Sequence, residues 1–82
     1  MKALKFYATW CEPCKMLSKI IEGVKDKITM PIEDIDIEQN MELAQKYNIR
    51  GVPALVIIDK DNVEVKRWSG MIMEDKLLEF LK

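Results

Sequence analysis

The pattern of apolar and polar positions in the first half of the chain changes from strand to helix and back to strand. Apolar and polar residues alternate from Leu4 to Ala8, which predicts a strand over about residues 2–8. A helix is predicted next, from about Pro13 to Lys27, where Pro13 suits the first turn. Its apolar face has the spacing i, i+3, i+4, i+7 and i+11: Leu17, Ile20, Ile21, Val24 and Ile28. A β-branched segment then predicts a second strand over Ile32–Ile37.

The second half of the chain predicts a short helix and a hairpin. Asn40 is suited to cap a helix over Met41–Tyr47, and Asn48 to end it in a left-handed conformation. The continuously apolar segment Ala54–Ile58 predicts a strand that is covered on both faces. Turn residues follow this segment, so Val63–Trp68 is predicted to return as the second strand of the hairpin.

A final amphipathic helix is predicted from about Met73, after Ser69 and Gly70 end the hairpin. The predicted order is therefore β-α-β-α-β-β-α, which implies an α/β fold with one four-stranded mixed sheet and helices on its faces. With 82 residues we expect a single domain over residues 1–82. Three methionines are expected to fill its core: Met16, Met30 and Met41.

The composition excludes several classes of protein. The chain has 13 Lys+Arg, 14 Asp+Glu and a net charge of −1, so it has no electrostatic footprint for nucleic acid or an anionic membrane. Its longest apolar run, Val52–Ile58, is far shorter than the ~20 residues that span a bilayer. Lys5 interrupts the apolar region that a signal peptide needs. We therefore expect a cytoplasmic protein, without contact to membranes or nucleic acid, that acts as a monomer.

The candidate chemistry lies in two cysteines, Cys11 and Cys14, where the first predicted strand ends and the first helix begins. The chain has no histidine, which excludes Ser-His and Cys-His pairs and His-ligated metals. Unpaired backbone N–H groups and the positive end of the helix dipole favour a thiolate at Cys11. Cys14 lies one turn further along, so the two sulfurs can approach bonding distance.

Two other interpretations of the cysteine pair stay open. The cysteines could be incidental small apolar residues, or half of a zinc site that a second subunit would complete. A cluster of acids follows later in the chain, but alternation places its members on both faces of a strand, so a solvated edge is expected and no metal: Glu33, Asp34, Asp36 and Glu38.

The region around these cysteines resembles the active-site signature of the thioredoxin family. The resemblance is carried by Phe6, Ala8, Trp10-Cys11 and Pro13-Cys14-Lys15. Asp36, the segment Tyr47–Pro53, the apolar strand, Gly70 and the last helix follow in the family's order.

The resemblance implies a thiol–disulfide oxidoreductase that reduces protein disulfides without a cofactor. Cys11 would be the nucleophile and Cys14 the resolving thiol, and Pro53 would be a cis-proline facing them. Four further residues would border the substrate groove: Trp10, Gly51, Val52 and Gly70. The electrons would come from a thioredoxin-reductase-like donor or from glutathione.

The chain departs from the family pattern at its start and inside the motif. We expect a minimal version of the fold, without the strand and helix that usually precede the first strand. Glu12 stands where thioredoxins usually have glycine, next to Pro13. Its carboxylate is expected to raise the pKa of Cys11 and to favour the oxidised form.

Lys5 and Asp34 occupy positions where the family usually has a buried Asp and a Lys, so the two charges are exchanged. Both residues could be solvated strand residues. Alternatively they form a reversed ion pair in a partly buried site behind the cysteines. Asp34 is then the candidate carboxylate for relaying a proton to Cys14.

Two other functions are considered. A glutaredoxin-like, glutathione-dependent reductase would explain the short chain, but Trp10 and the Glu12-Pro13 dipeptide resemble thioredoxins. A non-enzymatic interaction module of the same fold would not need the nucleophile, the resolving thiol and the facing proline.

Overall fold

The computed structural model describes all residues from Met1 to Lys82. Its elements follow the predicted order, with one additional 3₁₀ turn, η1. They are β1 (Lys2–Tyr7), α1 (Glu12–Val24), η1 (Lys25–Lys27), β2 (Ile32–Asp36), α2 (Met41–Lys46), β3 (Ala54–Ile58), β4 (Glu64–Ser69) and α3 (Glu74–Phe80). The predicted α/β class and element order are confirmed.

The four strands form one mixed sheet in the order β2-β1-β3-β4. β1 and β2 are parallel and are connected through α1, whereas β1 and β3 and the hairpin strands β3 and β4 are antiparallel. β1 therefore lies in the middle of the sheet, and Lys5 on β1 faces Asp34 on β2 in the register. This register brings together the two residues whose charges are exchanged.

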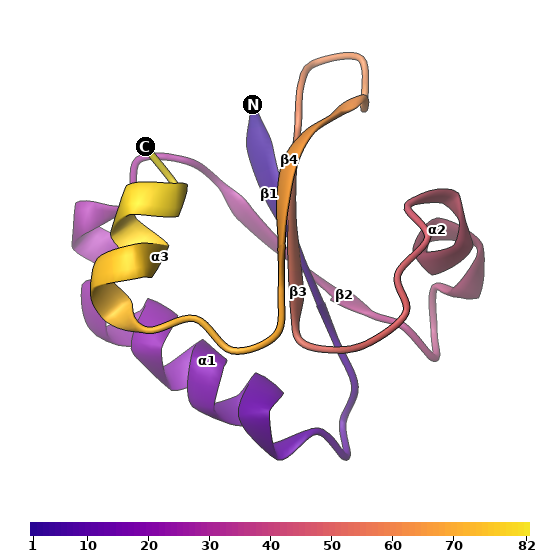
Figure 1. Cartoon of the computed structure of the whole chain (residues 1–82), viewed down its shortest axis with the longest axis horizontal. Helices are drawn as coiled ribbons and strands as arrows, with labels where there is room; N and C mark the ends of the chain where they lie inside the picture. Colours follow the sequence, from indigo (N-terminus) through magenta and orange to yellow (C-terminus); the bar gives the residue numbers. More distant parts are fainter.

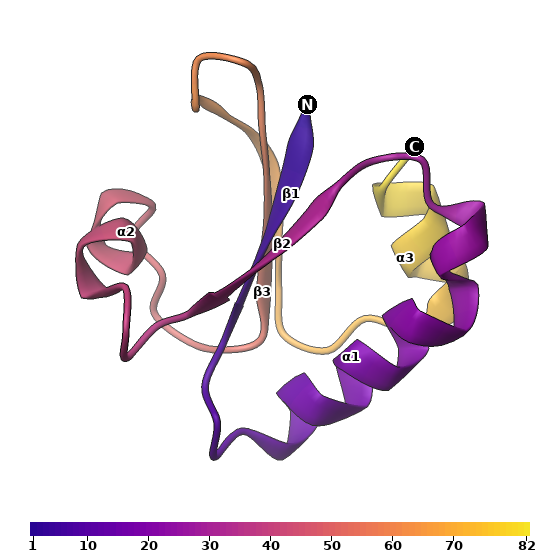
Figure 2. The same ribbon diagram turned by 180° about the vertical axis from the view of Figure 1, so that it is seen from behind.

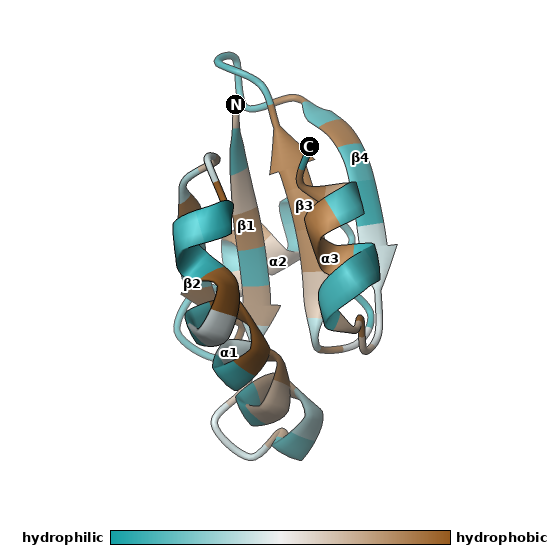
Figure 3. Cartoon of the chain, turned by 90° about the vertical axis from the view of Figure 1, so that its left-hand side faces the viewer, coloured by the Kyte–Doolittle hydropathy of each residue, from teal (hydrophilic) through white to brown (hydrophobic).

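The helices cover the sheet on both faces. α1 and α3 lie on one face and α2 lies on the other (Figure 1), and the view from behind shows the same separation (Figure 2). β3 is hydrophobic almost throughout its length (Figure 3), as expected for a strand covered on both sides. The larger core lies between the sheet and the α1/α3 layer, where Leu17 and Leu77 are fully buried. A second core around Phe6 and Tyr47 lies on the α2 side.

The ends of the predicted helices differ from the structure in two places. The helix of the βαβ unit, α1, ends at Val24, and Lys25–Lys27 form the 3₁₀ turn η1. Ile28, which follows η1, still packs against the α1/α3 core. Asn40 occupies the N-cap position of α2, but its side chain does not cap the helix and instead donates to the carbonyl oxygen of Asp36. Asn48 has a φ of 53°, so the left-handed termination is confirmed.

Two of the three methionines expected in the core are exposed. Met16 and Met41 are on the surface, whereas Met30 packs against the α1/α3 core. Met16 follows Lys15 on the outward side of α1, one position before the buried Leu17. No helix of the chain is both long and apolar enough to cross a membrane.

Candidate active site

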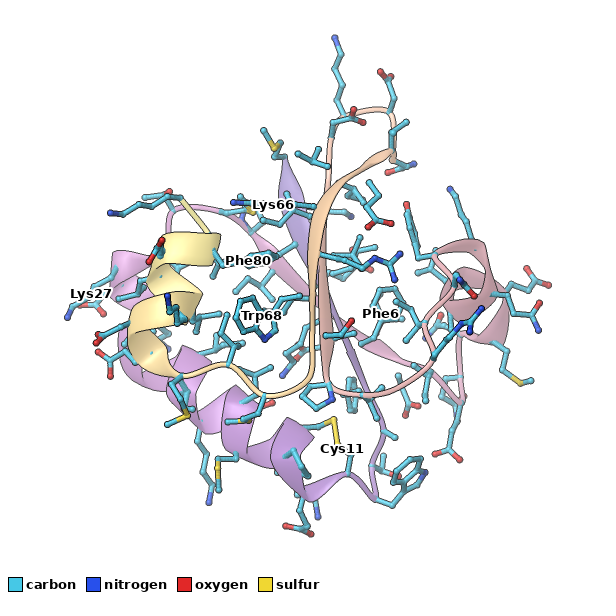
Figure 4. All side chains as sticks on the ribbon, viewed as in Figure 1. Phe6, Cys11, Lys27, Lys66, Trp68 and Phe80 are labelled. Atoms are coloured by element: carbon cyan, nitrogen blue, oxygen red, sulfur yellow. A yellow bond between two sulfur atoms is a disulfide. The ribbon has the colours of Figure 1, made fainter.

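The two cysteines lie at the amino end of α1 and are joined by a disulfide. Their Cα atoms are 5.2 Å apart, and both residues are buried. Figure 4 shows the bond between the sulfurs at the start of α1, beyond the ends of the sheet strands. The structure is thus that of the oxidised form, and the predicted placement of Cys14 one turn inside the helix is correct.

Cys11 is the N-cap residue of α1 and caps the helix with its own sulfur. Its backbone is extended, with φ −89° and ψ 106°, and its Sγ accepts a hydrogen bond from the backbone N–H of Cys14 at 3.1 Å. Pro13 lies in the first turn, where its missing N–H leaves no helix bond unmade. An N–H donor and the positive end of the helix dipole both favour negative charge on this sulfur once the disulfide is opened.

Trp10 lies in the turn that leads into Cys11. The N–H of Cys11 donates to the carbonyl of Ala8 at 3.1 Å, which closes a tight turn over residues 8–11. The Trp10 side chain is 66% exposed, beside the buried disulfide. A large amphipathic side chain in this position offers a contact surface next to the reacting sulfurs.

Three of the residues predicted to border the groove come together with Pro53 beside the cluster that contains the cysteines. Gly51, Val52, Pro53 and Gly70 line a surface hollow of about 430 Å³. The Val52–Pro53 peptide bond is cis, and Val52 packs against the cluster formed by Ala8, Cys11 and Cys14. The N–H of Gly70 donates to the carbonyl of Pro53 at 2.9 Å, and Gly70 has a φ of 94° that only glycine adopts readily.

Lys5 and Asp34 are in contact behind the cysteines. The Lys5 Nζ lies 3.2 Å from the Asp34 Oδ1 and also donates to the Ser18 Oγ on α1. The two partners differ in burial, because Lys5 is only 4% exposed whereas the Asp34 side chain is 61% exposed. The reversed ion pair is therefore formed, with its lysine inside and its carboxylate at the surface.

Glu12 points away from the disulfide into solvent. Its side chain is 82% exposed, and its Oε1 lies 3.2 Å from the Lys15 Nζ. Lys15 therefore partly neutralises the carboxylate that was expected to act on Cys11. Beside this pair, Met16 and Met71 line a second surface hollow that the sequence reasoning did not identify.

Arg67 also lines the hollow of Pro53. Its guanidinium bonds both carboxylate oxygens of Glu64 at 2.6 Å and the carbonyl of Tyr47 at 2.6 Å. The hydrogen bonds from Arg67 hold the pKa of Glu64 below its ordinary value. The bond to Tyr47 joins β4 to the end of α2 beside the hollow. No group of three or more His, Cys, Asp or Glu side chains is arranged to hold a metal ion.

Comparison with known proteins gives one consistent family. The family model described as Thioredoxin matches residues 2–82. The thioredoxin of Mycoplasmoides gallisepticum is 37% identical over 78 residues, which cover 94% of this chain and 77% of that protein. The thioredoxin of Bacillus subtilis is 32% identical over 78 residues, which cover 93% of this chain and 74% of that protein.

Solved structures agree with the sequence matches. A mutant thioredoxin from Halobacterium salinarum superposes with a TM-score of 0.86 at 35% identity, covering 96% of this chain and 69% of that one. The thioredoxin of Fasciola hepatica superposes with a TM-score of 0.83 at 36% identity, covering 96% and 75%. With two cysteines bonded at the helix start, the chain has the chemistry of a thiol–disulfide oxidoreductase that reduces protein disulfides. It belongs to the thioredoxin family.

Proposed function

We propose that Cys11 is the nucleophile of the reduced protein and Cys14 its resolving thiol. The Cys11 thiolate attacks one sulfur of a substrate disulfide, so that a mixed disulfide forms and one substrate thiolate leaves. Cys14 then attacks the Cys11 sulfur, which releases the second substrate thiolate and restores the Cys11–Cys14 bond. The substrate gains two electrons and the two cysteines lose them. The observation that carries this assignment is the N–H of Cys14 donating to the Cys11 sulfur at the N-cap of α1.

We propose that the substrates are proteins with an accessible disulfide and that they bind over Cys11. Trp10 would cover one flank of the substrate and the hollow of Gly51, Val52, Pro53 and Gly70 the other. The exposure of Trp10 and the size of the hollow, about 430 Å³, suit an extended peptide segment better than a large rigid surface. Glu12 would modulate Cys11 weakly from the rim, since it pairs with Lys15.

The electrons that reopen the disulfide would come from a thioredoxin-reductase-like enzyme, with glutathione as the second candidate donor. We also infer that the protein acts as a cytoplasmic monomer without nucleic-acid or membrane partners. The net charge of −1 supports the absence of nucleic-acid and membrane partners, because it provides no strong field toward polyanions or anionic lipid.

Reduction of insulin disulfides tests the proposal, with a bacterial thioredoxin reductase and NADPH in one arm and glutathione in the other. We expect turnover in the reductase arm and only background reduction with glutathione. Cys11→Ser should fall to background, whereas a non-enzymatic interaction module would give background with the wild-type chain too. Faster turnover with glutathione than with the reductase would identify a glutaredoxin-like enzyme.

A further inference from the structure

Lys5 is a buried cation that the exchange reaction described above does not use. It is the only charged residue of the chain that is buried, at 4% exposure. A buried charge is costly unless it is paired and hydrogen-bonded. The packing of β1 alone therefore does not explain a lysine at this position.

The contacts of Lys5 hold its ammonium group against α1. The Nζ lies 3.2 Å from Asp34 Oδ1 and 5.8 Å from the centre of the Tyr7 ring. It also donates to the Ser18 hydroxyl, whose own O–H remains free to donate elsewhere. The ammonium is thus held between a surface carboxylate, an aromatic face and a hydroxyl of the helix that carries the cysteines.

Ser18 connects this cation to the inner cysteine. Cys14 and Ser18 are four residues apart on α1, which places their side chains next to each other on one helix face. Both line the same surface hollow of about 430 Å³, together with Tyr7 from β1. Cys14 itself is 2% exposed, and burial disfavours its thiolate, the form that must attack in the resolving step.

We propose that the Lys5 ammonium is the charge that makes the buried Cys14 thiolate accessible at neutral pH. The inference rests on the proposed role of Cys14 as resolving thiol and adds the group that enables it. Cys14 loses its proton to water in the hollow beside it. The thiolate then forms the bond to the Cys11 sulfur, the bond between Cys11 and the substrate breaks, and the substrate sulfur leaves with the electron pair and takes a proton from water.

Other charged groups near Cys14 are placed less favourably for this role. On α1 itself, Lys15 also lines the hollow of Cys14, but its side chain is 57% exposed and pairs with Glu12 at the surface. On β2, Asp36 faces Tyr7 in the register and its Oδ1 accepts the N–H of Glu38. Val52 and Pro53 carry no charge, and Arg50 before them is exposed and lines a different hollow. Lys5 is therefore the one cation that reaches this part of the helix from inside the fold.

The structure also changes the role expected for Asp34. Its carboxylate contacts the ammonium of Lys5, and Lys5 rather than Asp34 contacts the α1 turn of Ser18. A carboxylate in this arrangement reduces the positive field at Cys14 instead of accepting its proton. The two roles predict opposite effects of removing the Asp34 charge.

Stopped-flow mixing of the reduced protein with 5,5′-dithiobis(2-nitrobenzoate) separates the two steps. The first released thionitrobenzoate reports attack by Cys11 and depends on reagent concentration. The second reports attack by Cys14 and does not, because it is intramolecular. A wild-type chain without the second phase at any pH would refute the resolving role of Cys14, whereas the Lys5 inference concerns only the pH at which that phase appears.

In Lys5→Met we expect the second phase to be about tenfold slower at pH 7, with its pH midpoint raised by about one unit, as for loss of a nearby opposite charge. The matched control Lys5→Arg keeps the charge and should stay within about threefold of wild type. An unchanged midpoint in Lys5→Met, or an equal slowing in Lys5→Arg, would overturn the proposal.

The exposed Asp34 gives a second test that does not depend on whether Lys5→Met folds. Asp34→Asn should lower the midpoint of the second phase and leave the first phase in place, because the cation loses its counter-ion. An unchanged or raised midpoint would contradict the proposal, and a raised one would identify Asp34 as the proton acceptor of Cys14.

Discussion

The two sulfurs of the site lie in different environments although they belong to one disulfide. Cys11 is surrounded by backbone groups and uncharged side chains: the N–H of Cys14, the turn of Trp10 and the cis peptide of Val52–Pro53. Cys14 lies on the opposite side, toward Ser18 and the charged Lys5 and Asp34. In the proposed mechanism, the nucleophile Cys11 therefore depends on helix geometry, and the resolving thiol Cys14 depends on the side chains around it.

This difference explains why substitutions can alter the two steps separately. A helix N-terminus depends on the backbone and survives most side-chain changes. A charged pair with one buried member depends on two particular residues and changes when either is replaced. Exchange of the charges between Lys5 and Asp34 is thus expected to leave attack by Cys11 unchanged and to alter the step that closes the disulfide.

The largest difference between Cys11 and Cys14 is expected when the two cysteines are replaced one at a time. Cys14→Ser should lose multiple turnover but retain one attack on substrate, because Cys11 keeps its place at the N-cap. The mixed disulfide with an insulin chain should then accumulate and be visible by intact mass spectrometry. Cys11→Ser should form no such adduct at neutral pH. Equal trapping by both variants would show that the sulfurs have interchangeable roles.

Trp10→Ala tests whether the surface beside Cys11 binds the substrate. Loss of a large aromatic contact at an interface typically costs more than 1 kcal/mol, so KM for insulin should rise roughly five- to tenfold with little change in kcat. The redox potential of the Cys11–Cys14 pair should stay the same, since Trp10 is exposed and carries no charge. A changed potential with an unchanged KM would argue against a binding role.

Glu12→Gly is expected to have a smaller effect, which also acts on Cys11. Removing the carboxylate should lower the pKa of Cys11 and raise the redox potential by about 15 mV or less, roughly a threefold change in the equilibrium constant. The effect is small because Glu12 is 82% exposed and pairs with Lys15. Glutathione redox titration measures it, and Glu12→Gln controls for the flexibility of glycine. A lower potential in the glycine variant would contradict the hypothesis.

The ion pair of Glu64 and Arg67, at the hollow of Pro53, gives the smallest effect and is tested through the stability of the fold. Because the pKa of Glu64 is lowered in the folded state, the pair stabilises the fold above the ordinary carboxyl value of 4.5 and loses this contribution as the pH falls through the lowered pKa. Glu64→Gln should lower the free energy of unfolding by under about 1 kcal/mol at pH 7, because about a third of each side chain is exposed. Urea titrations at pH 7 and pH 3 should show the difference shrinking, whereas a constant difference would exclude an ionic cause.

Much of the fold could be predicted from the sequence because its pattern is local. The apolar face from Leu17 to Ile28 predicts the helix of the βαβ unit, and the continuous run Ala54–Ile58 predicts the strand covered on both sides. The cysteine pair could be placed at the helix start for the same reason, since the spacing and the strand-to-helix change are visible in the chain.

The features that could not be predicted depend on contacts between distant segments. Alternation places Lys5 on the polar face of its strand, but that face is covered by α1, so the lysine is buried. Ser18 carries no motif, and only the packing of α1 on β1 brings it to the ammonium. Asn40 has the right type and position for a cap, yet the turn after β2 offers it the carbonyl of Asp36 instead.

The most direct test of the central claim is the pH dependence of iodoacetamide alkylation of the fully reduced protein, with the modified cysteine identified by peptide mass spectrometry. The account predicts that Cys11 is alkylated first, with a midpoint clearly below the value of about 8.5 for an ordinary thiol. A Cys11 that reacts no faster than Cys14, with a midpoint at or above that value, would contradict it.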